Sequence, residues 1–112
     1  MPMLLEKKRC LPCEGGQPPL MQKDVDKLLP EINKAWSVKR STTLLREFIF
    51  KDFKEALVFV DAIGALAEKE GHHPDIGLHW GRVVVELSTH AIGGLSENDF
   101  IMARKIDIIY EY

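Results

Sequence analysis

Three histidines in the second half of the chain are the residues best suited to acid–base chemistry. His72 and His73 are adjacent and precede Pro74, and His90 comes back at the end of the next segment that we expect to be extended. The unperturbed pKa of imidazole, about 6.5, lies closest to neutral pH among the side chains. If the fold brings these rings to one pocket, they make a site that can donate and accept protons.

Two carboxylates accompany these histidines, and each has a structural interpretation beside the functional one. Glu68 lies near the end of a predicted helix, where it could be a solvated surface residue. Asp99 follows Ser96 at the spacing of a capping-box partner, and taken alone this interpretation is the favoured one. The sequence by itself leaves both residues open between a site role and a local structural role.

The remaining polar and aromatic residues of this region also have structural explanations. His73 could interact with the dipole at the helix C-terminus, and the following proline restricts its backbone in any case. Trp80 is interpreted more readily as a packing residue than as a stacking platform. His79 is interpreted as a surface residue at a strand end.

A metal centre is the rival chemistry, because four histidines and two cysteines are a possible ligand set. Neighbouring side chains of an extended backbone point to opposite faces, so adjacent histidines rarely bind one ion. The sequence also lacks a pair of histidines at the helical spacing that zinc enzymes often use. We therefore expect no metal centre.

Length and composition indicate one ordinary globular domain. The chain has 112 residues, of which 46% are hydrophobic and 29% charged, with a formal net charge of −2. This charge gives no reason to expect a nucleic-acid partner, which needs a basic face on the protein. No apolar run reaches the roughly 18 residues that cross a membrane. The first residues lack the long apolar stretch of a secretory signal, so we expect a cytoplasmic protein.

The N-terminal segment, residues 1–19, is predicted to be a flexible leader, because glycine and proline are concentrated at its end. It holds both cysteines, Cys10 and Cys13, as a single C-x-x-C. A zinc ribbon needs a second pair, and a thioredoxin-like motif needs a strand before it and a helix after it. We interpret the cysteines as two thiols in a mobile loop, on which the core does not depend.

Residues 20–112 are predicted to form the folded domain. Apolar residues at helical spacing indicate a short helix from Leu20 to Pro30, a long helix from Asp52 to Gly71 and a last helix after Ser96. Segments rich in β-branched residues indicate a hairpin formed by Val38 and residues 43–50, and a second hairpin formed by residues 76–79 and 82–89. This order predicts an α+β fold with a four-stranded antiparallel sheet and three helices packed on one face.

The apolar face of the long helix is predicted from the +3/+4 spacing of its hydrophobic residues. These residues are Phe53, Ala56, Leu57, Val60, Ile63, Gly64 and Ala67.

The chain resembles the pterin-4a-carbinolamine dehydratases, and especially the bacterial members that accompany phenylalanine hydroxylase. The similarity covers about residues 20–110 and includes residues 48–53, 88–90 and 94–96. The family pattern of charged, histidine and aromatic positions is filled by Glu68, His72-His73-Pro74, Trp80, His90 and Asp99.

The resemblance implies a hydro-lyase, a 4a-hydroxytetrahydrobiopterin dehydratase that supports tetrahydropterin recycling. Its substrate, a 4a-hydroxytetrahydropterin, loses water to give the quinonoid dihydropterin, so one group must protonate the oxygen and another must take a proton from a ring nitrogen. By the resemblance, His72 and His90 are the acid–base pair and His73 binds the pterin. The pterin is then a substrate and not a prosthetic group, so we expect no bound cofactor. Glu68 and Asp99 would hold the imidazoles or complete the pocket.

The resemblance also implies partners. It points to a functional link with an aromatic amino-acid hydroxylase, and to a homo-oligomer, a dimer or a tetramer, which the free edges of a four-stranded sheet favour as well. A second role remains open, that of a non-enzymatic dimerisation cofactor or regulator of gene expression. Such a role would use helix and sheet-edge surfaces and would not need the histidines.

Overall fold

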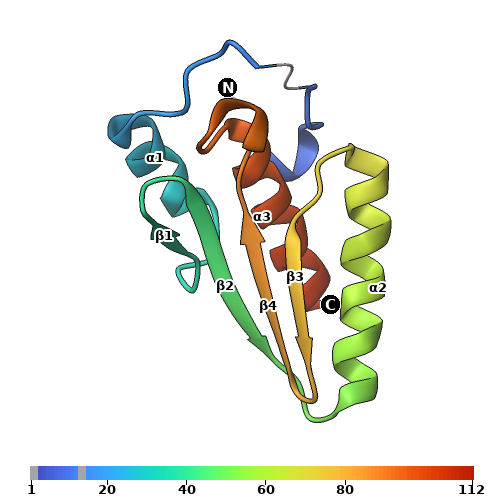
Figure 1. Cartoon of the computed structure of the whole chain (residues 1–112). Coiled ribbons are helices and arrows are strands. Elements are labelled where there is room, and N and C mark those ends of the chain that lie inside the picture. Colours follow the sequence, from blue (N-terminus) through green and yellow to red (C-terminus); the bar gives the residue numbers. More distant parts are fainter. Residues whose placement is uncertain (1–2, 13–14) are drawn as a thin grey trace.

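The computed structural model describes residues 3–12 and 15–112, and its helices and strands follow one another in the predicted order (Figure 1). The helices are α1 (Gln22–Leu28), α2 (Phe53–Glu70) and α3 (Glu97–Glu111). The strands are β1 (Ser37–Lys39), β2 (Thr43–Ile49), β3 (Asp75–His79) and β4 (Arg82–Leu87). Short 3₁₀ turns lie at η1 (Leu5–Lys7), η2 (Leu29–Glu31) and η3 (His90–Ile92).

The four strands form one antiparallel sheet in the order β1-β2-β4-β3, which confirms the predicted α+β class. β1 and β2 are joined by a tight turn in which Arg40 and Ser41 both have positive φ, at 54° and 61°. Lys39 pairs with Thr43, so the connection has three residues, and the Thr42 N–H donates to the Lys39 carbonyl at 3.0 Å across the turn. In the centre of the sheet Phe48 of β2 faces Val83 of β4, and Val83 in turn faces Leu78 of β3.

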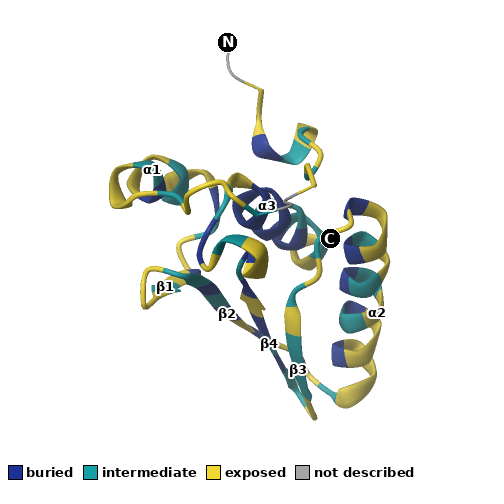
Figure 2. Ribbon diagram, turned by 45° about the horizontal axis from the view of Figure 1, so that its top comes forward, coloured by how far each residue is buried: buried dark blue, intermediate teal, exposed yellow. Residues whose placement is uncertain are grey.

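The sheet is buried on one face, as alternating residues require. Leu44 and Phe48 of β2 and Val83 and Val85 of β4 are fully buried, whereas Glu47 between the two β2 residues is exposed. α2 packs on β3 and β4, and α3 packs on β2 and β4 (Figure 2). The core therefore lies between the sheet and these two helices.

The long helix begins and ends where the sequence predicts. The side chain of Asp52 accepts a hydrogen bond from the Glu55 N–H at 2.9 Å, and Gly71 ends the helix with a φ of 68°. Its apolar face differs from the prediction, because Phe59 is buried while Phe53 and Leu57 are exposed. The buried residues follow a single +3/+4 stripe that includes Phe59, and Leu57 is displaced from this stripe.

β4 is shorter than predicted, which changes the local structure around His90. The strand ends at Leu87, and Thr89 pairs with Gly94 in an isolated bridge through an N–H···O bond of 2.8 Å. This bridge closes a tight loop, so His90 begins the η3 turn instead of ending a strand.

The N-terminal segment makes defined contacts with α3. Leu5 is 2% exposed and belongs to the hydrophobic core, which the sequence pattern did not indicate. Lys8 pairs with Glu97 at 3.0 Å. The flexibility of residues 1–19 concerns motion and stays a prediction, and Cys13 lies outside the described residues.

A buried ion pair connects the sheet to α3. Arg46 of β2 contacts Asp107 Oδ1 at 2.6 Å, and the same carboxylate accepts bonds from the Trp36 indole at 2.7 Å and the Asn33 N–H at 2.8 Å. The guanidinium carbon lies 4.4 Å from the centre of the Phe48 ring. Asp107 therefore satisfies three groups, two from the connection between η2 and β1 and one from β2.

Within the described residues, no helix is both long enough and apolar enough to cross a membrane.

Candidate active site

The three predicted histidines lie on the wall of one cavity of about 230 Å³. The cavity is at the end of the sheet where α2 ends, β4 ends and α3 begins, and these ends of the elements lie at the top of Figure 1. His72 and His73 come from the connection between α2 and β3, and His90 comes from η3. The described residues that line the cavity are Leu11, Gly71, His72, His73, Ser88, Thr89, His90, Ala91 and Asn98.

His72 is held by the buried carboxylate of Asp99. Its Nε2 lies 2.7 Å from Asp99 Oδ1, and the imidazole is itself largely buried. The other carboxylate oxygen accepts bonds from the Thr89 hydroxyl at 2.8 Å and from the Ser96 N–H at 2.9 Å. Asp99 thus caps α3 and contacts His72 at the same time, so its two interpretations are compatible.

This contact has a consequence for the protons of His72. An ionised carboxylate is only an acceptor, so Nε2 donates to Asp99 and the neutral ring keeps its lone pair on Nδ1. The tautomer is assigned here from the hydrogen-bond network. A carboxylate behind an imidazole also fixes the orientation of the ring.

His73 contacts Glu68 in the preceding turn of α2 through its Nε2 and the carboxylate Oε2. Both side chains are exposed, so this pair contributes little to the free energy of folding. Its effect is to restrict the orientation of the His73 ring beside the cavity.

His90 is exposed, and its backbone is fixed by the η3 turn. The Gly93 N–H donates to the His90 carbonyl at 3.2 Å, and Gly93 has a φ of 67°, a conformation that favours glycine. The imidazole therefore lies on a rigid turn with access to solvent.

Trp80 and His79 lie at the opposite end of the sheet. Trp80 is 68% exposed in the connection between β3 and β4, at the bottom of Figure 1. Neither residue is among the described residues that line the histidine cavity. The resemblance includes Trp80 in the family pattern, but the structure places it away from this cavity.

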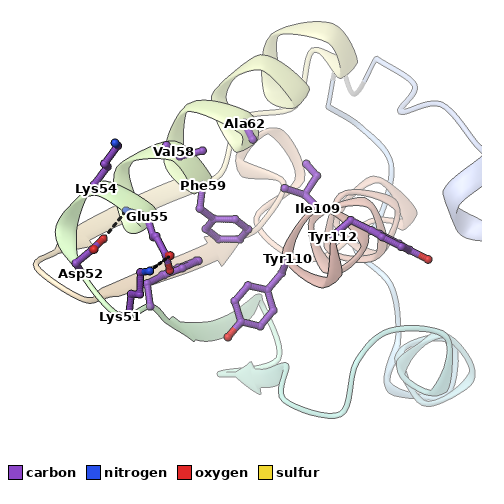
Figure 3. A pocket seen from close by; sticks show the side chains of 11 residues that line it. Lys51, Asp52, Lys54, Glu55, Val58, Phe59, Ala62, Ile109, Tyr110 and Tyr112 are labelled. Atoms are coloured by element: carbon purple, nitrogen blue, oxygen red, sulfur yellow. Dashed lines mark hydrogen bonds and ion pairs between the residues drawn. The ribbon is translucent and has the colours of Figure 1, made fainter.

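A larger groove of about 560 Å³ lies between α2 and the end of α3 (Figure 3). Its floor is aromatic, formed by Phe50, Phe59 and Tyr110, and Lys51 and Glu55 form an ion pair at its rim. The described residues that line it include no histidine, so it lacks groups that exchange protons readily near neutral pH. We place the candidate site in the smaller cavity for this reason.

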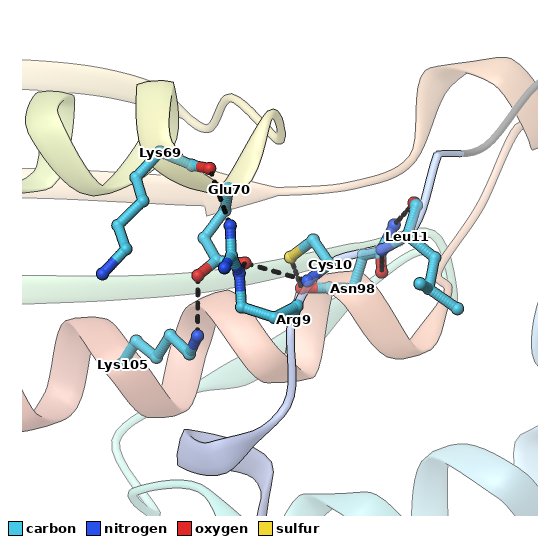
Figure 4. Close-up of polar contacts among 7 residues, drawn as sticks. All are labelled: Arg9, Cys10, Leu11, Lys69, Glu70, Asn98 and Lys105. Atoms are coloured by element: carbon cyan, nitrogen blue, oxygen red, sulfur yellow. Dashed lines mark hydrogen bonds and ion pairs between the residues drawn. The ribbon is translucent and has the colours of Figure 1, made fainter.

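A charged cluster next to the cavity was not indicated by the sequence (Figure 4). The buried carboxylate of Glu70 contacts Lys105 Nζ at 2.7 Å, Arg9 Nε at 3.4 Å and the Cys10 N–H at 2.9 Å. Burial raises the pKa of Glu70, but the hydrogen bonds from Lys105 and Cys10 and the two positive charges outweigh it, so the pKa is lowered. Burial and the nearby Glu70 charge raise the pKa of the Cys10 thiol to about 12, which keeps it protonated and unreactive at neutral pH.

The lowered pKa of Glu70 predicts acid sensitivity. The folded-state pKa lies below the ordinary value of 4.5, so the stabilisation is complete above pH 4.5 and is lost as the pH falls through the folded-state pKa. We expect Glu70→Gln to lower the free energy of unfolding at pH 7 by about 1–3 kcal/mol. Urea unfolding from pH 7 to pH 3 should show this difference shrinking at the acid end.

Glu47→Gln, which alters the exposed pair with Arg82, is the matched control and should cost less than about 1 kcal/mol at any pH. A Glu70→Gln difference that stays constant down to pH 3 would contradict the assignment.

Several lining residues were missed by sequence reasoning. Thr89 is adjacent to His90 and Asn98 to Asp99, so proximity to the histidine pattern was the one available signal. Leu11 had no signal, because the fold alone brings the N-terminal segment to the cavity.

Among the residues that the structure describes, no three His, Cys, Asp or Glu side chains are grouped to hold a metal ion. The absence of a cofactor stays a prediction.

Comparison with known proteins agrees with the resemblance. Residues 18–109 match the family model described as pterin 4 alpha carbinolamine dehydratase. A candidate pterin-4-alpha-carbinolamine dehydratase of Rickettsia bellii is 50% identical over 105 residues, which covers 94% of this chain and 93% of that protein.

Two solved structures are similar in fold. A transcriptional coactivator/pterin dehydratase from Brucella melitensis has a TM-score of 0.76 and 34% identity, covering 82% of this chain and 98% of that one. A pterin dehydratase-like protein identified as a RuBisCO assembly factor in the alpha-carboxysome has a TM-score of 0.60 and 24% identity, with 70% of this chain and 92% of that chain covered. The second likeness concerns the fold alone.

Proposed function

This chain belongs to the pterin 4 alpha carbinolamine dehydratase family, and we propose on that premise that it dehydrates a 4a-hydroxytetrahydropterin. The products are the quinonoid dihydropterin and water. The observation that carries the proposal is the cavity on which His72, His73 and His90 converge, with Asp99 behind His72. The family gives the reaction, and the cavity supplies groups that suit it.

The reaction is an elimination that needs two proton transfers. The bond between C4a and the hydroxyl oxygen breaks, and a donated proton lets that oxygen leave as water. The proton on the adjacent ring nitrogen is removed, and its bonding electrons form the new C4a=N double bond. Positioned acid and base groups accelerate such steps by about 10²–10⁴-fold.

The surroundings of the histidines suggest a division of these tasks. His72 keeps a lone pair on Nδ1 while its Nε2 is engaged with Asp99, so we assign it as the base at the ring nitrogen. His90 is exposed on its turn and can be reprotonated by solvent, so we assign it as the acid at the hydroxyl. His73, oriented by Glu68, would position the pterin.

The proposal places the chain after an aromatic amino-acid hydroxylase, which releases the 4a-hydroxypterin. With limiting pterin, excess dihydropteridine reductase and NADH, adding this chain to such a hydroxylase should raise the steady rate of NADH oxidation. An unchanged rate at every concentration of the chain would contradict a role in recycling.

We further propose that the chain forms a homo-oligomer, a dimer or a tetramer. β1 and β3 are the outer strands of the sheet, and unpaired edges readily pair with another copy. α2 also exposes Phe53, Leu57 and Val58. Light scattering at micromolar concentration should give a mass above that of the monomer, and a monomer mass alone would contradict the proposal.

A regulatory role is the second candidate, since the relative from Brucella melitensis is described as both a transcriptional coactivator and a pterin dehydratase. Such a role would use surfaces remote from the cavity. If a biological effect of the chain survives loss of His72 and His90, the effect is regulatory; if it disappears, the effect depends on the dehydratase.

A further inference from the structure

The N-terminal strap, defined here as residues 9–11, lies across the end of α2 and the first half of α3 (Figure 4). The reaction proposed above makes no use of it. Leu11, its last residue, nevertheless lines the histidine cavity together with Asn98. The strap thus brings a residue distant in the sequence to the candidate site.

Two reciprocal hydrogen bonds fix the position of Leu11. Its N–H donates to Asn98 Oδ1 at 2.9 Å, and its carbonyl accepts from Asn98 Nδ2 at 2.6 Å. Asn98 is largely buried at the start of α3, directly before Asp99. Both backbone polar groups of Leu11 are thus satisfied by one side chain, which fixes the backbone of this residue.

Glu70 provides a second anchor for the strap. Its buried carboxylate accepts from the Cys10 N–H, and Arg9 Nη2 donates to the Lys69 carbonyl at 3.3 Å at the end of α2. Glu70 is the last residue of α2, immediately before Gly71 and His72. The strap is therefore attached to the same two helix ends that position His72 and Asp99.

The side chain of Leu11 differs in character from most of the cavity. Leu11 is large and apolar, whereas the other lining side chains are mainly polar or small. The residue is also 72% exposed. An exposed apolar side chain at the rim of a polar cavity gives a flat, partly apolar ligand a surface to cover. A pterin has such a ring, with polar edges that suit the remaining lining.

We propose that the strap is one wall of the substrate pocket, that Leu11 contacts the bound pterin, and that Asn98 is a positioning residue that holds Leu11 there. The proposal rests on the proposed dehydratase function and adds a binding element to its site. Because the contact is made in the ground state and in the transition state alike, it acts on KM and leaves kcat nearly unchanged.

The test compares Leu11→Ala, Asn98→Ala and Lys8→Ala in dehydratase kinetics. Leu11→Ala keeps the backbone bonds and removes an exposed side chain, so the protein should fold normally. Asn98→Ala releases the strap. Both should raise KM about tenfold, with kcat within about twofold of the wild type. Lys8→Ala removes the exposed pair with Glu97, outside the cavity, and should leave KM unchanged.

Hydrogen exchange gives a readout that does not depend on turnover. With 7,8-dihydrobiopterin as the probe, the Cys10 and Leu11 amides of the wild-type chain should exchange more slowly when the probe is bound. In Asn98→Ala this protection should be lost. A purely structural role of Asn98 predicts faster exchange without any dependence on the probe.

The outcomes separate the two proposals. If the wild-type chain is active and the Leu11→Ala variant has the same KM, the strap is not a wall of the pocket. A Leu11→Ala variant that loses kcat at constant KM contradicts the proposal too. Bound probe without protection of the two amides overturns it as well. The wild-type chain could also bind the probe and protect the strap amides without dehydrating the substrate. That result would contradict the proposed reaction and support the strap as a wall of the ligand pocket.

Discussion

His72→Ala and His90→Ala should each lower kcat by about 10²-fold or more, whereas His73→Ala should mainly raise KM. Removing a proton-transfer group takes away an interaction made in the transition state, so kcat falls. Removing a group that only positions the substrate weakens ground state and transition state alike, so KM rises. Steady-state kinetics of the three variants, with the uncatalysed dehydration subtracted, measures this division.

His79→Ala is the matched control, because His79 lies at the other end of β3 from the cavity. It should retain the kinetics of the wild type. Circular dichroism should show that all four variants are folded. The rings of His73, His79 and His90 are exposed, and in His72→Ala the Asp99 carboxylate keeps its bonds from Thr89 and Ser96. Full kcat in a folded His72→Ala protein would show that the acid–base assignment is wrong.

Asp107→Ala should lower the free energy of unfolding by about 3–5 kcal/mol. The substitution leaves the Arg46 guanidinium buried without its counter-ion and removes the acceptor of the Trp36 indole and the Asn33 N–H. Breaking one side of a buried pair costs far more than the pair contributes over an apolar replacement. Urea unfolding followed by tryptophan fluorescence measures the loss.

Two further variants sharpen this result. Glu47→Ala breaks the exposed pair with Arg82 and should cost less than about 1 kcal/mol. Arg46→Met combined with Asp107→Leu removes both charges and should recover part of the stability lost by Asp107→Ala. If Asp107→Ala and the double variant are equally unstable, the loss of stability comes from packing and not from the uncompensated charge of Arg46.

The sequence was most informative where local chemistry decides the structure. Asp52 and Gly71 bound α2 because a capping carboxylate and a left-handed glycine act on their own neighbours. The alternation Val83, Val85, Leu87 predicted the buried face of β4 for the same reason. Each of these signals is complete within a few residues.

The sequence was less informative where distant segments meet. The contact of Leu11 with Asn98 joins residues far apart in the chain, and no periodicity records it. Phe59 was missed because its place in the buried stripe depends on how α2 rolls against the sheet. The early end of β4 depended on the bridge between Thr89 and Gly94, a pairing that single-strand patterns do not contain.

Asp99 shows how one residue can satisfy a local and a distant requirement together. Its place after Ser96 predicted a capping box, and the hydrogen bond from the Ser96 N–H is present. Its contact with His72 depends on α3 beginning beside the end of α2, which only the fold establishes. The local interpretation was therefore sound without being complete.

The most direct measurement is the rate at which a 4a-hydroxytetrahydropterin decays, followed by stopped flow. The decay is compared with the wild-type chain, with the His72→Ala/His90→Ala double variant and with buffer alone. We expect the wild type to accelerate the decay in proportion to its concentration, and the folded double variant to stay close to the rate in buffer. A wild-type chain that leaves the decay at the buffer rate, or a double variant that matches the wild type, would contradict histidine-catalysed dehydration in this cavity.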